Sequence, residues 1–376
     1  LDGSSDDLRE FLAAAVSARL IDIEEDAVRC ENKLTEDHTF DQIRLENPIE
    51  VYANEVAPLP EVEEAVRVAF AECDHRTARD YAGLAFDDEL RALDWDRRLF
   101  NKEKHREINA KETATADPAP FILLPPEPRN LGILLVHGFL AAPGEIRPIG
   151  EKLAAAGYPV MGLRLKGHGT SPWDLRERSW RDWLQSVARG YDIVRAYCEK
   201  VAIVGFSTGG ALTLLTAARQ PEGLAGIVSI APPIKFKNRN MRLVPLVHGA
   251  NQLVERLSNL EGLLQFRPTD TEHPSINYRH MPIRGLYELT RMIAEVKRSL
   301  NKVRCPALVI QGTEDHVVEP RSAEIVYGKL ASTDKQLSWI ESKRHGILFE
   351  DVGETHAIIF EFLARLEHEI SASNPD

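Results

Sequence analysis

Residues 201–215 read VAIVGFSTGGALTLL, and this stretch decides the fold. The apolar residues 201–204 predict a buried strand and residues 211–215 predict a helix, so the backbone must turn sharply at Ser207. Glycine on either side, at positions 205 and 209, lets the turn pass close to neighbouring backbone without a Cβ clash. A serine on such a strained turn between strand and helix presents its hydroxyl to substrate. Ser207 is therefore the candidate nucleophile.

Two residues that could activate Ser207 follow predicted strands further along the chain. A serine hydroxyl is a poor nucleophile until a histidine takes its proton and a carboxylate orients that histidine. Asp315 follows the apolar run 306–311, and His345 follows the run 336–340. All three residues would lie on turns at one edge of the sheet. We therefore predict Asp315 as the acid and His345 as the base.

Neighbouring titratable residues compete for these roles. Glu314 adjoins Asp315, but the spacing from Gly312 to Asp315, just before a valine, favours Asp315 and leaves Glu314 as a solvated neighbour. His316 cannot readily turn back onto Ser207. The base therefore remains His345.

The oxyanion hole also has a candidate loop. The apolar run 132–136 predicts a strand that ends in His137-Gly138-Phe139-Leu140. One backbone N–H would come from the residue after the nucleophile, Thr208, and the other from this loop, at Phe139. Both roles belong to backbone atoms.

Together these motifs resemble the α/β-hydrolase superfamily, nearest to its carboxylesterase and monoacylglycerol lipase branch. The resemblance covers the chain from about Pro118 to the C-terminus. It implies ester hydrolysis by Ser207, Asp315 and His345 in that chain order, a lid inserted after the sixth strand, structural histidines in the early loops and no cofactor. Beyond the triad it rests on residues 137–139, 167–171 and 312–318 and on Trp180 and Trp183.

The surroundings of His345 depart from the family pattern. The family's histidine usually follows a small residue, whereas His345 follows Lys343 and Arg344. Two cations beside a general base lower its pKa unless they point away or pair with Glu341 or Glu350.

Strand-like and helical segments alternate along the second part of the chain. Near-continuous apolar strands between helices predict an α/β fold, in which a mostly parallel sheet is covered by helices on both faces. The predicted strands are 121–124, 132–136, 160–165, 201–205, 226–231, 307–311 and 336–340, and the predicted helices include 145–156, 180–199, 210–219, 321–330 and 355–370.

The alternation stops between residues 233 and 302, where we predict a helical cap insertion. Helical patterns occur at 253–264 and 286–300. Apolar cap residues either line an acyl-chain pocket above Ser207 or merely pack the cap onto the core. The candidates for substrate binding are Met241, Leu243, Val244, Val247, Met281 and Ile283, with Leu246 and Leu286 beside them.

Residues 1–117 are predicted to form an acidic, mainly helical N-terminal extension before a catalytic domain at 118–376. The extension carries 30 acidic and 15 basic residues, a net charge of −15, whereas residues 233–302 carry 12 basic and 6 acidic residues, a net charge of +6. Opposite signs suggest that extension and cap face one another. Alternatively, the extension is simply a solvated acidic segment, or it joins copies of the chain into a homo-oligomer.

Composition limits the class of protein. The chain has 376 residues, a net charge of −12 and 43% hydrophobic residues. The acidity argues against a nucleic-acid partner, and the lack of an apolar run of eighteen residues argues against a membrane span. The four cysteines are too scattered along the chain for a metal site, and we expect them to be reduced thiols: Cys30, Cys73, Cys198 and Cys305. With no signal peptide visible after Leu1, although a leader could have been trimmed, we expect a cytoplasmic protein.

The sequence thus predicts a serine esterase that cleaves a small-molecule carboxylic ester through an acyl-enzyme, with no metal or cofactor. A thioesterase or a peptidase could use the same triad. A non-catalytic ligand-binding protein on a hydrolase scaffold is the alternative outside enzymes, because fold does not imply function.

Overall fold

A computed structural model of the chain describes residues 75–238 and 264–373 continuously, with short pieces between positions 12 and 71 and between 244 and 249. The chain divides into two compact units, Leu1–Arg76 and Thr77–Asp376. In the described part of the first unit, β1 (Ile21–Glu24) pairs antiparallel with β2 (Ala27–Cys30). This hairpin was not predicted, since that unit was expected to be mainly helical.

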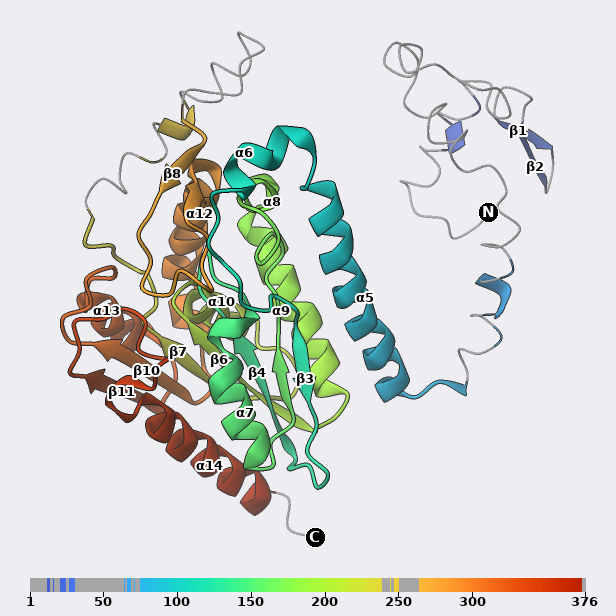
Figure 1. Cartoon of the computed structure of the whole chain (residues 1–376). Coiled ribbons are helices and arrows are strands. Elements are labelled where there is room, and N and C mark those ends of the chain that lie inside the picture. The colour runs from blue at the N-terminus through green and yellow to red at the C-terminus, as the bar shows by residue number, and fades with distance from the viewer. Residues whose placement is uncertain are drawn as a thin grey trace. The chain divides into compact units, whose positions relative to one another are not determined.

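A seven-stranded sheet forms the centre of the second unit (Figure 1). Its strands are rich in Val, Ile and Leu and are mostly buried on both faces, as parallel strands between helices require. Six strands run parallel, and the edge strand β3 runs antiparallel to β5. In sheet order they are β11 (Lys335–Ile340), β10 (Ala307–Gly312), β7 (Leu224–Ile230), β6 (Lys200–Phe206), β4 (Leu131–Val136), β5 (Val160–Gly162) and β3 (Phe121–Leu123).

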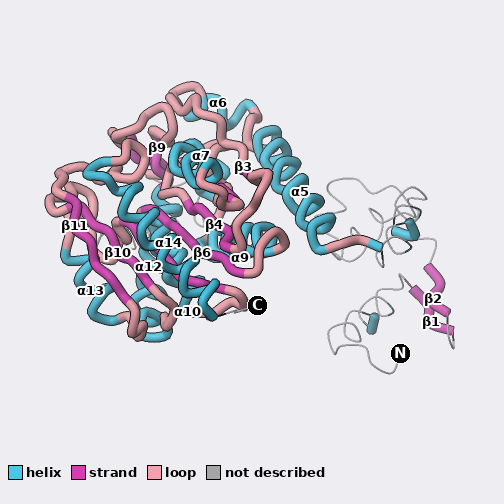
Figure 2. Tube along the Cα trace, turned by 90° about the horizontal axis from the view of Figure 1, so that it is seen from below, coloured by secondary structure: helices cyan, strands magenta, loops and turns pink. Residues whose placement is uncertain are grey.

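Helices cover both faces of this sheet, so the structure has three layers (Figures 1 and 2). Alternate residues of one strand serve opposite cores: Ile133 packs in the same core as α7 and α14, and Leu134 packs with α9 and α10. The helices are α7 (Arg147–Ala155), α8 (Pro172–Glu177), α9 (Trp180–Arg195), α10 (Thr208–Ala218), α13 (Arg321–Lys329) and α14 (Thr355–Ser373).

The turn from β6 to α10 has the predicted sharp geometry. Ser207 has φ 54° and ψ −115°, a strained backbone conformation for a residue with a Cβ. A Cβ on Gly209 would lie 2.1 Å from the Val136 carbonyl oxygen, and one on Gly205 would lie 2.3 Å from the Gly209 carbonyl oxygen. Glycine is therefore required at both positions.

Of the predicted cap, residues 233–238 and 264–302 are described continuously, with short pieces between 244 and 249. The cap contains the hairpin of β8 (Phe266–Pro268) and β9 (His280–Pro282), followed by α12 (Ile283–Ser299). Helix α12 corresponds to the helix predicted at 286–300, and its apolar face joins the same core as α9 and α10. The helix predicted at 253–264 lies almost entirely outside the described residues.

Residues 77–117 belong to the second unit, although the predicted boundary put them in the extension. They form α5 (Ala78–Leu99), the short 3-10 turn η3 (Glu103–His105) and α6 (Arg106–Asn109). Ala82 and Leu93 of α5 are buried in the core that α9 shares. The division therefore falls between residues 76 and 77 rather than at 117/118.

A buried carboxylate, Asp96, and a partly buried one, Glu112, tie this segment to the rest of the second unit. Asp96, 2% exposed, pairs with the fully buried Arg164 at 3.1 Å and with Lys166 at 2.8 Å. Glu112 accepts the backbone N–H groups of Arg279 at 2.6 Å and His280 at 3.0 Å on the cap hairpin. A count of charges predicts a solvated segment, whereas these acids are paired inside the protein.

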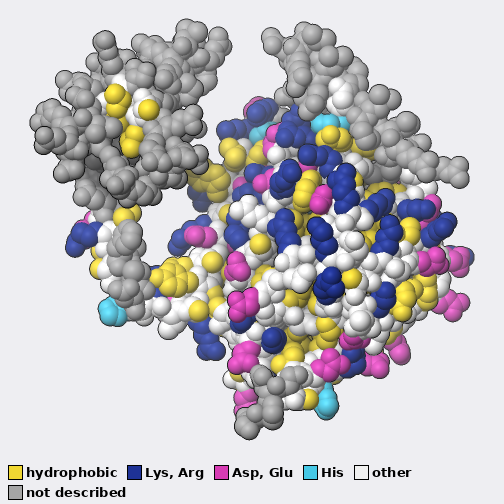
Figure 3. Space-filling model, turned by 180° about the vertical axis from the view of Figure 1, so that it is seen from behind, with side chains coloured by type: hydrophobic (Ala, Val, Ile, Leu, Met, Phe, Trp, Pro, Cys, Tyr) yellow, Lys and Arg dark blue, Asp and Glu magenta, His cyan; other side chains and the backbone are white. Residues whose placement is uncertain are grey.

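The surface of the second unit carries charges of both signs. Residues 77–376 have a net charge of +1 by count. Figure 3 shows Lys and Arg side chains spread across one face, with Asp and Glu mainly toward its edges. In the described part of the chain, no helix is both long and apolar enough to cross a membrane.

Candidate active site

The structure brings Ser207, Asp315 and His345 together at the carboxyl ends of β6, β10 and β11. Ser207 Oγ lies 3.0 Å from His345 Nε2, and His345 Nδ1 lies 2.7 Å from Asp315 Oδ2. The serine hydroxyl can donate to Nε2 while Nδ1–H donates to the carboxylate. This is the relay of hydrogen bonds that activates a serine for attack on a carbonyl group.

Asp315 is fully buried and held in place by several donors. Its Oδ1 accepts the amides of Val317 at 2.8 Å and Val318 at 2.9 Å, and its Oδ2 accepts Gln311 Nε2 at 3.0 Å. Burial by itself opposes ionisation, but the hydrogen bond from His345, the electrostatic interaction with that ring and the two amides outweigh it and lower the pKa of Asp315. The acid is therefore ionised at neutral pH.

Glu314 and His316, the alternatives to Asp315 and His345, lie outside the triad. The exposed Glu314 side chain is 3.8 Å from the Lys343 ammonium group. His316 is also exposed, and its Nδ1 lies 3.0 Å from the Lys343 carbonyl oxygen. Neither side chain takes part in the hydrogen bonds between Asp315, His345 and Ser207.

The two cations before His345 are paired with carboxylates. Arg344 bonds Glu350 with both of its terminal nitrogens, and Nη2 lies 2.8 Å from Oε1. Lys343 faces Glu314, as described above. The sequence offered Glu341 and Glu350 as partners for these cations, and Arg344 bonds Glu350.

A cap residue, Glu272, holds the backbone of the histidine loop. Its two carboxylate oxygens accept the amides of His345 and Gly346, each at 2.8 Å. A Cβ on Gly346 would lie 2.6 Å from Glu272 Oε2, so this close approach requires glycine. Hydrophobic periodicity gives no signal for such a residue, and sequence reasoning missed it.

The loop after β4 lies beside the elbow. Phe139 and Thr208, the predicted sources of oxyanion donors, both line a cavity together with Ser207. His137 precedes this loop and is fully buried; burial lowers its pKa to about 4 against the raising effect of its bond to the Gly138 carbonyl. Burial likewise places the pKa of His168 well below its usual value. Both histidines are therefore neutral and structural at pH 7.

The cavity at the triad has a volume of about 340 Å³. Its apolar wall includes Met281 and Leu286, which were candidates, and Phe236 and Leu289, which were not. Val244 and Ile283 are buried in the core, and Val247 packs against it; these three are not among the described lining residues. Met241, Leu243 and Leu246 lie outside the described residues.

The cavity also has polar lining residues that were not predicted, and most of them come from β8 and the segment between β8 and β9. Three of the lining residues have a buried side-chain atom without a hydrogen-bond partner: Thr208 Oγ1, His273 Nε2 and Asn277 Oδ1. The polar residues that β8 and this segment contribute are Arg267, Thr269, Asp270, Thr271, Glu272, His273 and Asn277.

Glu145 is a further carboxyl group in the cavity wall. It is 4% exposed and ends the 3-10 turn η4 (Pro143–Glu145). Burial raises its pKa to about 7, although a hydrogen bond from the Gly138 amide partly opposes the shift. Within the described ranges, no group of three or more His, Cys, Asp or Glu is arranged to hold a metal ion.

The raised pKa of Glu145 predicts how stability depends on pH. An unfolded glutamate ionises near pH 4.5, so the folded state loses stability as pH rises from 4.5 to about 7, by about 3 kcal/mol. Glu145→Gln removes this loss. The unfolding free energy of the variant minus that of wild type, measured in urea, should be about 3 kcal/mol more positive at pH 8 than at pH 4.5. A difference independent of pH would contradict the raised pKa.

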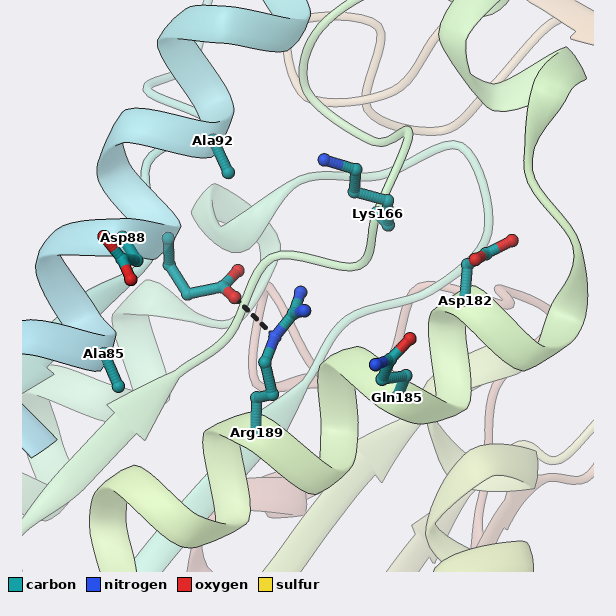
Figure 4. A pocket seen from close by; sticks show the side chains of 8 residues that line it. Ala85, Asp88, Ala92, Lys166, Asp182, Gln185 and Arg189 are labelled. Atoms are coloured by element: carbon teal, nitrogen blue, oxygen red, sulfur yellow. Dashed lines mark ion pairs between the residues drawn. The ribbon is translucent and has the colours of Figure 1, made fainter. Parts of the chain in front are cut away.

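A second hollow lies between α5 and α9 (Figure 4). Its volume is about 300 Å³, and Glu89 Oε1 and Arg189 Nε form an ion pair of 2.7 Å across it. None of the three candidate catalytic residues lines it. Its charged groups serve to join the two helices.

Comparisons with known proteins match the second unit. A family model described as serine aminopeptidase, S33, matches residues 127–352, more than half of the chain. Thermostable monoacylglycerol lipase of Bacillus sp. (strain H-257) is 34% identical over 218 residues, which are 57% of this chain and 82% of that protein. Carboxylesterase of Bacillus subtilis (strain 168) is 28% identical over 237 residues, 62% of this chain and 93% of that protein.

Solved structures agree with these matches. A structure from work on LipS and LipT, two metagenome-derived lipolytic enzymes, has a TM-score of 0.58 and 28% identity, and covers 68% of this chain and 99% of that chain. A monoacylglycerol lipase from Paleococcus ferrophilus has a TM-score of 0.53 at 23% identity, over 66% of this chain and 98% of that chain, which supports the fold.

Proposed function

The chain belongs to the serine aminopeptidase S33 family of α/β hydrolases, which confirms the predicted superfamily and fold class, and from this premise we propose that it hydrolyses monoacylglycerols. Its lipase and carboxylesterase relatives make it a serine ester hydrolase, as predicted. The observation that carries the proposal is the hydrogen-bonded series Asp315, His345 and Ser207 beside a cavity lined by both apolar and polar side chains.

In the proposed reaction Ser207 Oγ attacks the ester carbonyl carbon while His345 Nε2 takes its proton. Ionised Asp315 orients the ring through Nδ1 and stabilises the imidazolium. The amides of Phe139 and Thr208 donate to the oxyanion of the tetrahedral intermediate. His345 then gives its proton to the leaving alcohol, and a water activated by the same ring releases the acid from the acyl-enzyme.

The mixed lining of the cavity supports a substrate with an apolar chain and a polar head. Met281, Leu286 and Leu289 offer apolar surface to an acyl chain. Polar side chains that line the same cavity, among them Thr269 and Asn277, can hydrogen-bond the glycerol hydroxyls, which a simple alkyl ester lacks. A monoacylglycerol therefore matches this cavity better than a methyl ester of the same acid.

The test compares a monoacylglycerol with the methyl ester of the same fatty acid. We expect kcat/KM to be about tenfold higher for the monoacylglycerol, the value of one or two net hydrogen bonds. Asn277→Leu should lower kcat/KM for the monoacylglycerol by about threefold to tenfold and leave the methyl ester within twofold. Equal values for the two substrates in the wild-type enzyme would refute recognition of the glycerol group.

Membership of the serine aminopeptidase S33 family favours peptidase activity as the second candidate function. An aminoacyl anilide with a free amino group, assayed beside the esters and a thioester of the same acid, distinguishes the classes. We expect the oxygen ester to have the highest kcat/KM. A higher value for the anilide would make the chain a peptidase.

Our proposals about the partners and the location of the chain rest on the sequence alone. We propose self-association through residues 1–117, no nucleic-acid partner and a cytoplasmic location, on the basis of charge and composition.

A further inference from the structure

Glu145 contacts the loop that is proposed to carry the oxyanion hole. The Gly138 N–H donates to Glu145 Oε2 at 2.6 Å. The bond joins positions seven residues apart and closes the loop between β4 and α7 on itself. The glutamate comes from η4, and its carboxyl group lines the cavity that Ser207 also lines.

His137 holds the same loop from the other side of Gly138. The Leu165 N–H donates to His137 Nε2 at 3.1 Å, so Nε2 is an acceptor and the proton of the neutral ring is on Nδ1. His137 Nδ1–H then donates to the Gly138 carbonyl oxygen at 2.9 Å. Gly138 is thus held at its N–H by Glu145 and at its carbonyl by His137.

These two bonds determine the direction of the next amide. In a planar trans peptide, the carbonyl oxygen of Gly138 and the N–H of Phe139 point in opposite directions. Once the oxygen is fixed toward His137, the Phe139 N–H must point away from that ring. A rotation of the Gly138–Phe139 peptide would break the bond to His137, and a shift of Gly138 would break the bond to Glu145.

We propose that Glu145 is a positioning residue for the oxyanion hole: its carboxyl group holds Gly138 so that the Phe139 amide stays aimed at the oxyanion. This inference rests on the proposed function, because it assumes that Phe139 N–H stabilises the intermediate. In this role Glu145 acts on the reacting atoms through the loop.

The location of Glu145 distinguishes this role from simple packing. A buried carboxyl group is expensive to desolvate, and an apolar side chain would fill the same space at lower cost. An ideal Cβ built on Gly138 would lie 3.2 Å from Glu145 Oε2 and 3.5 Å from Ser207 Cβ, so the carboxyl group and the nucleophile flank the same residue. A small displacement at Gly138 therefore acts at the catalytic centre.

The test uses a pair of variants of similar shape. Glu145→Gln keeps an oxygen that can accept the Gly138 N–H, whereas Glu145→Met has nearly the same volume and offers only a weak sulfur acceptor. Glu288 provides the control, because it is 6% exposed and accepts a backbone N–H, that of Trp180, at 3.2 Å, beside an ion pair of 2.7 Å with Arg291. Glu288→Met removes both interactions of a buried carboxylate outside the oxyanion loop, and Glu288→Gln keeps an acceptor for the Trp180 N–H.

The readouts are kcat and KM with p-nitrophenyl butyrate, the rate of inactivation by a phosphonate that forms a tetrahedral adduct on Ser207, and thermal melting. We expect Glu145→Met to lower kcat and the inactivation rate by about 30-fold to 100-fold, somewhat less than complete loss of an oxyanion donor, with KM within twofold. Glu145→Gln should stay within about threefold of wild type. Glu288→Met should lower the melting temperature but leave kcat within twofold.

Three results would overturn the proposal. These are an unchanged kcat in Glu145→Met, an equal loss in Glu145→Gln and Glu145→Met, and a loss of kcat in Glu288→Met as large as that in Glu145→Met. If Glu145→Met does not fold, Glu145→Asp replaces it, since the shorter side chain withdraws the acceptor and must then have a lower kcat than Glu145→Gln. A wild-type enzyme inert toward every ester would refute the proposed function instead.

Discussion

Replacing Ser207 with alanine is expected to leave the protein folded and to lower kcat by about a thousandfold or more. The nucleophile is removed, and only binding and the oxyanion donors remain to accelerate the reaction. Folding should persist because alanine has the same Cβ on the strained turn, and the flanking glycines keep their close approaches to Val136 and Gly209. Turnover of p-nitrophenyl butyrate and labelling by a fluorophosphonate measure the loss.

Ser229→Ala is the matched control for this prediction. Ser229 is fully buried in the neighbouring strand β7, and its Oγ donates to the Gly210 carbonyl oxygen at 3.0 Å. We expect this variant to retain kcat within a few-fold and to label normally. A Ser207→Ala enzyme with turnover near wild type would exclude Ser207 from the mechanism.

Removing residues 1–118 is expected to prevent folding, whereas removing residues 1–76 should leave the second unit folded and active. The longer deletion removes Asp96 and leaves Arg164, which is 0% exposed, without its ion-pair partner. An uncompensated buried charge typically costs about 3–5 kcal/mol, a large share of the stability of a domain. The longer deletion also removes the apolar contacts of α5 with the core.

A point variant isolates the charge from the packing. Asp96→Asn should lower the unfolding free energy by about 3 kcal/mol or more, because the amide cannot neutralise Arg164. Asp88→Asn on the exposed side of α5 is the control: its pair with Arg91 is solvent-exposed, so the change should stay within about 0.5 kcal/mol. Urea unfolding of both variants measures the difference. An Asp96→Asn protein as stable as the Asp88→Asn protein would mean that Arg164 does not need its partner.

The sheet and the elbow could be predicted because their signals are local. The Gly-x-Ser-x-Gly turn needs glycine for steric reasons that five residues contain, and the buried strands show as apolar runs. The structure places Asp315 and His345 beside Ser207 because parallel strands end at the same edge, a consequence of topology rather than of distance in the chain.

The lining of the cavity and the packing of α5 were harder to predict from the sequence, because they depend on contacts between residues that are far apart in the chain. Val244 and Ile283 are as apolar as Met281, and apolar pattern alone does not distinguish a residue that packs in the core from one that lines a cavity. A count of charges treats Asp96 as one of the acids of a solvated extension, although its carboxylate pairs with Arg164 inside the protein. The net charge of a segment gives the sign of its charge but does not show which of its charged groups are paired.

Glu272 couples the wall of the substrate cavity to the alignment of the catalytic base. It lies in the cap segment and lines the cavity, yet its carboxylate bonds the amides of His345 and Gly346. A change that displaces Glu272 therefore breaks both bonds at once and alters the cavity at the same time. Substrate binding and orientation of the imidazole depend on the same side chain, so such a change alters kcat together with KM.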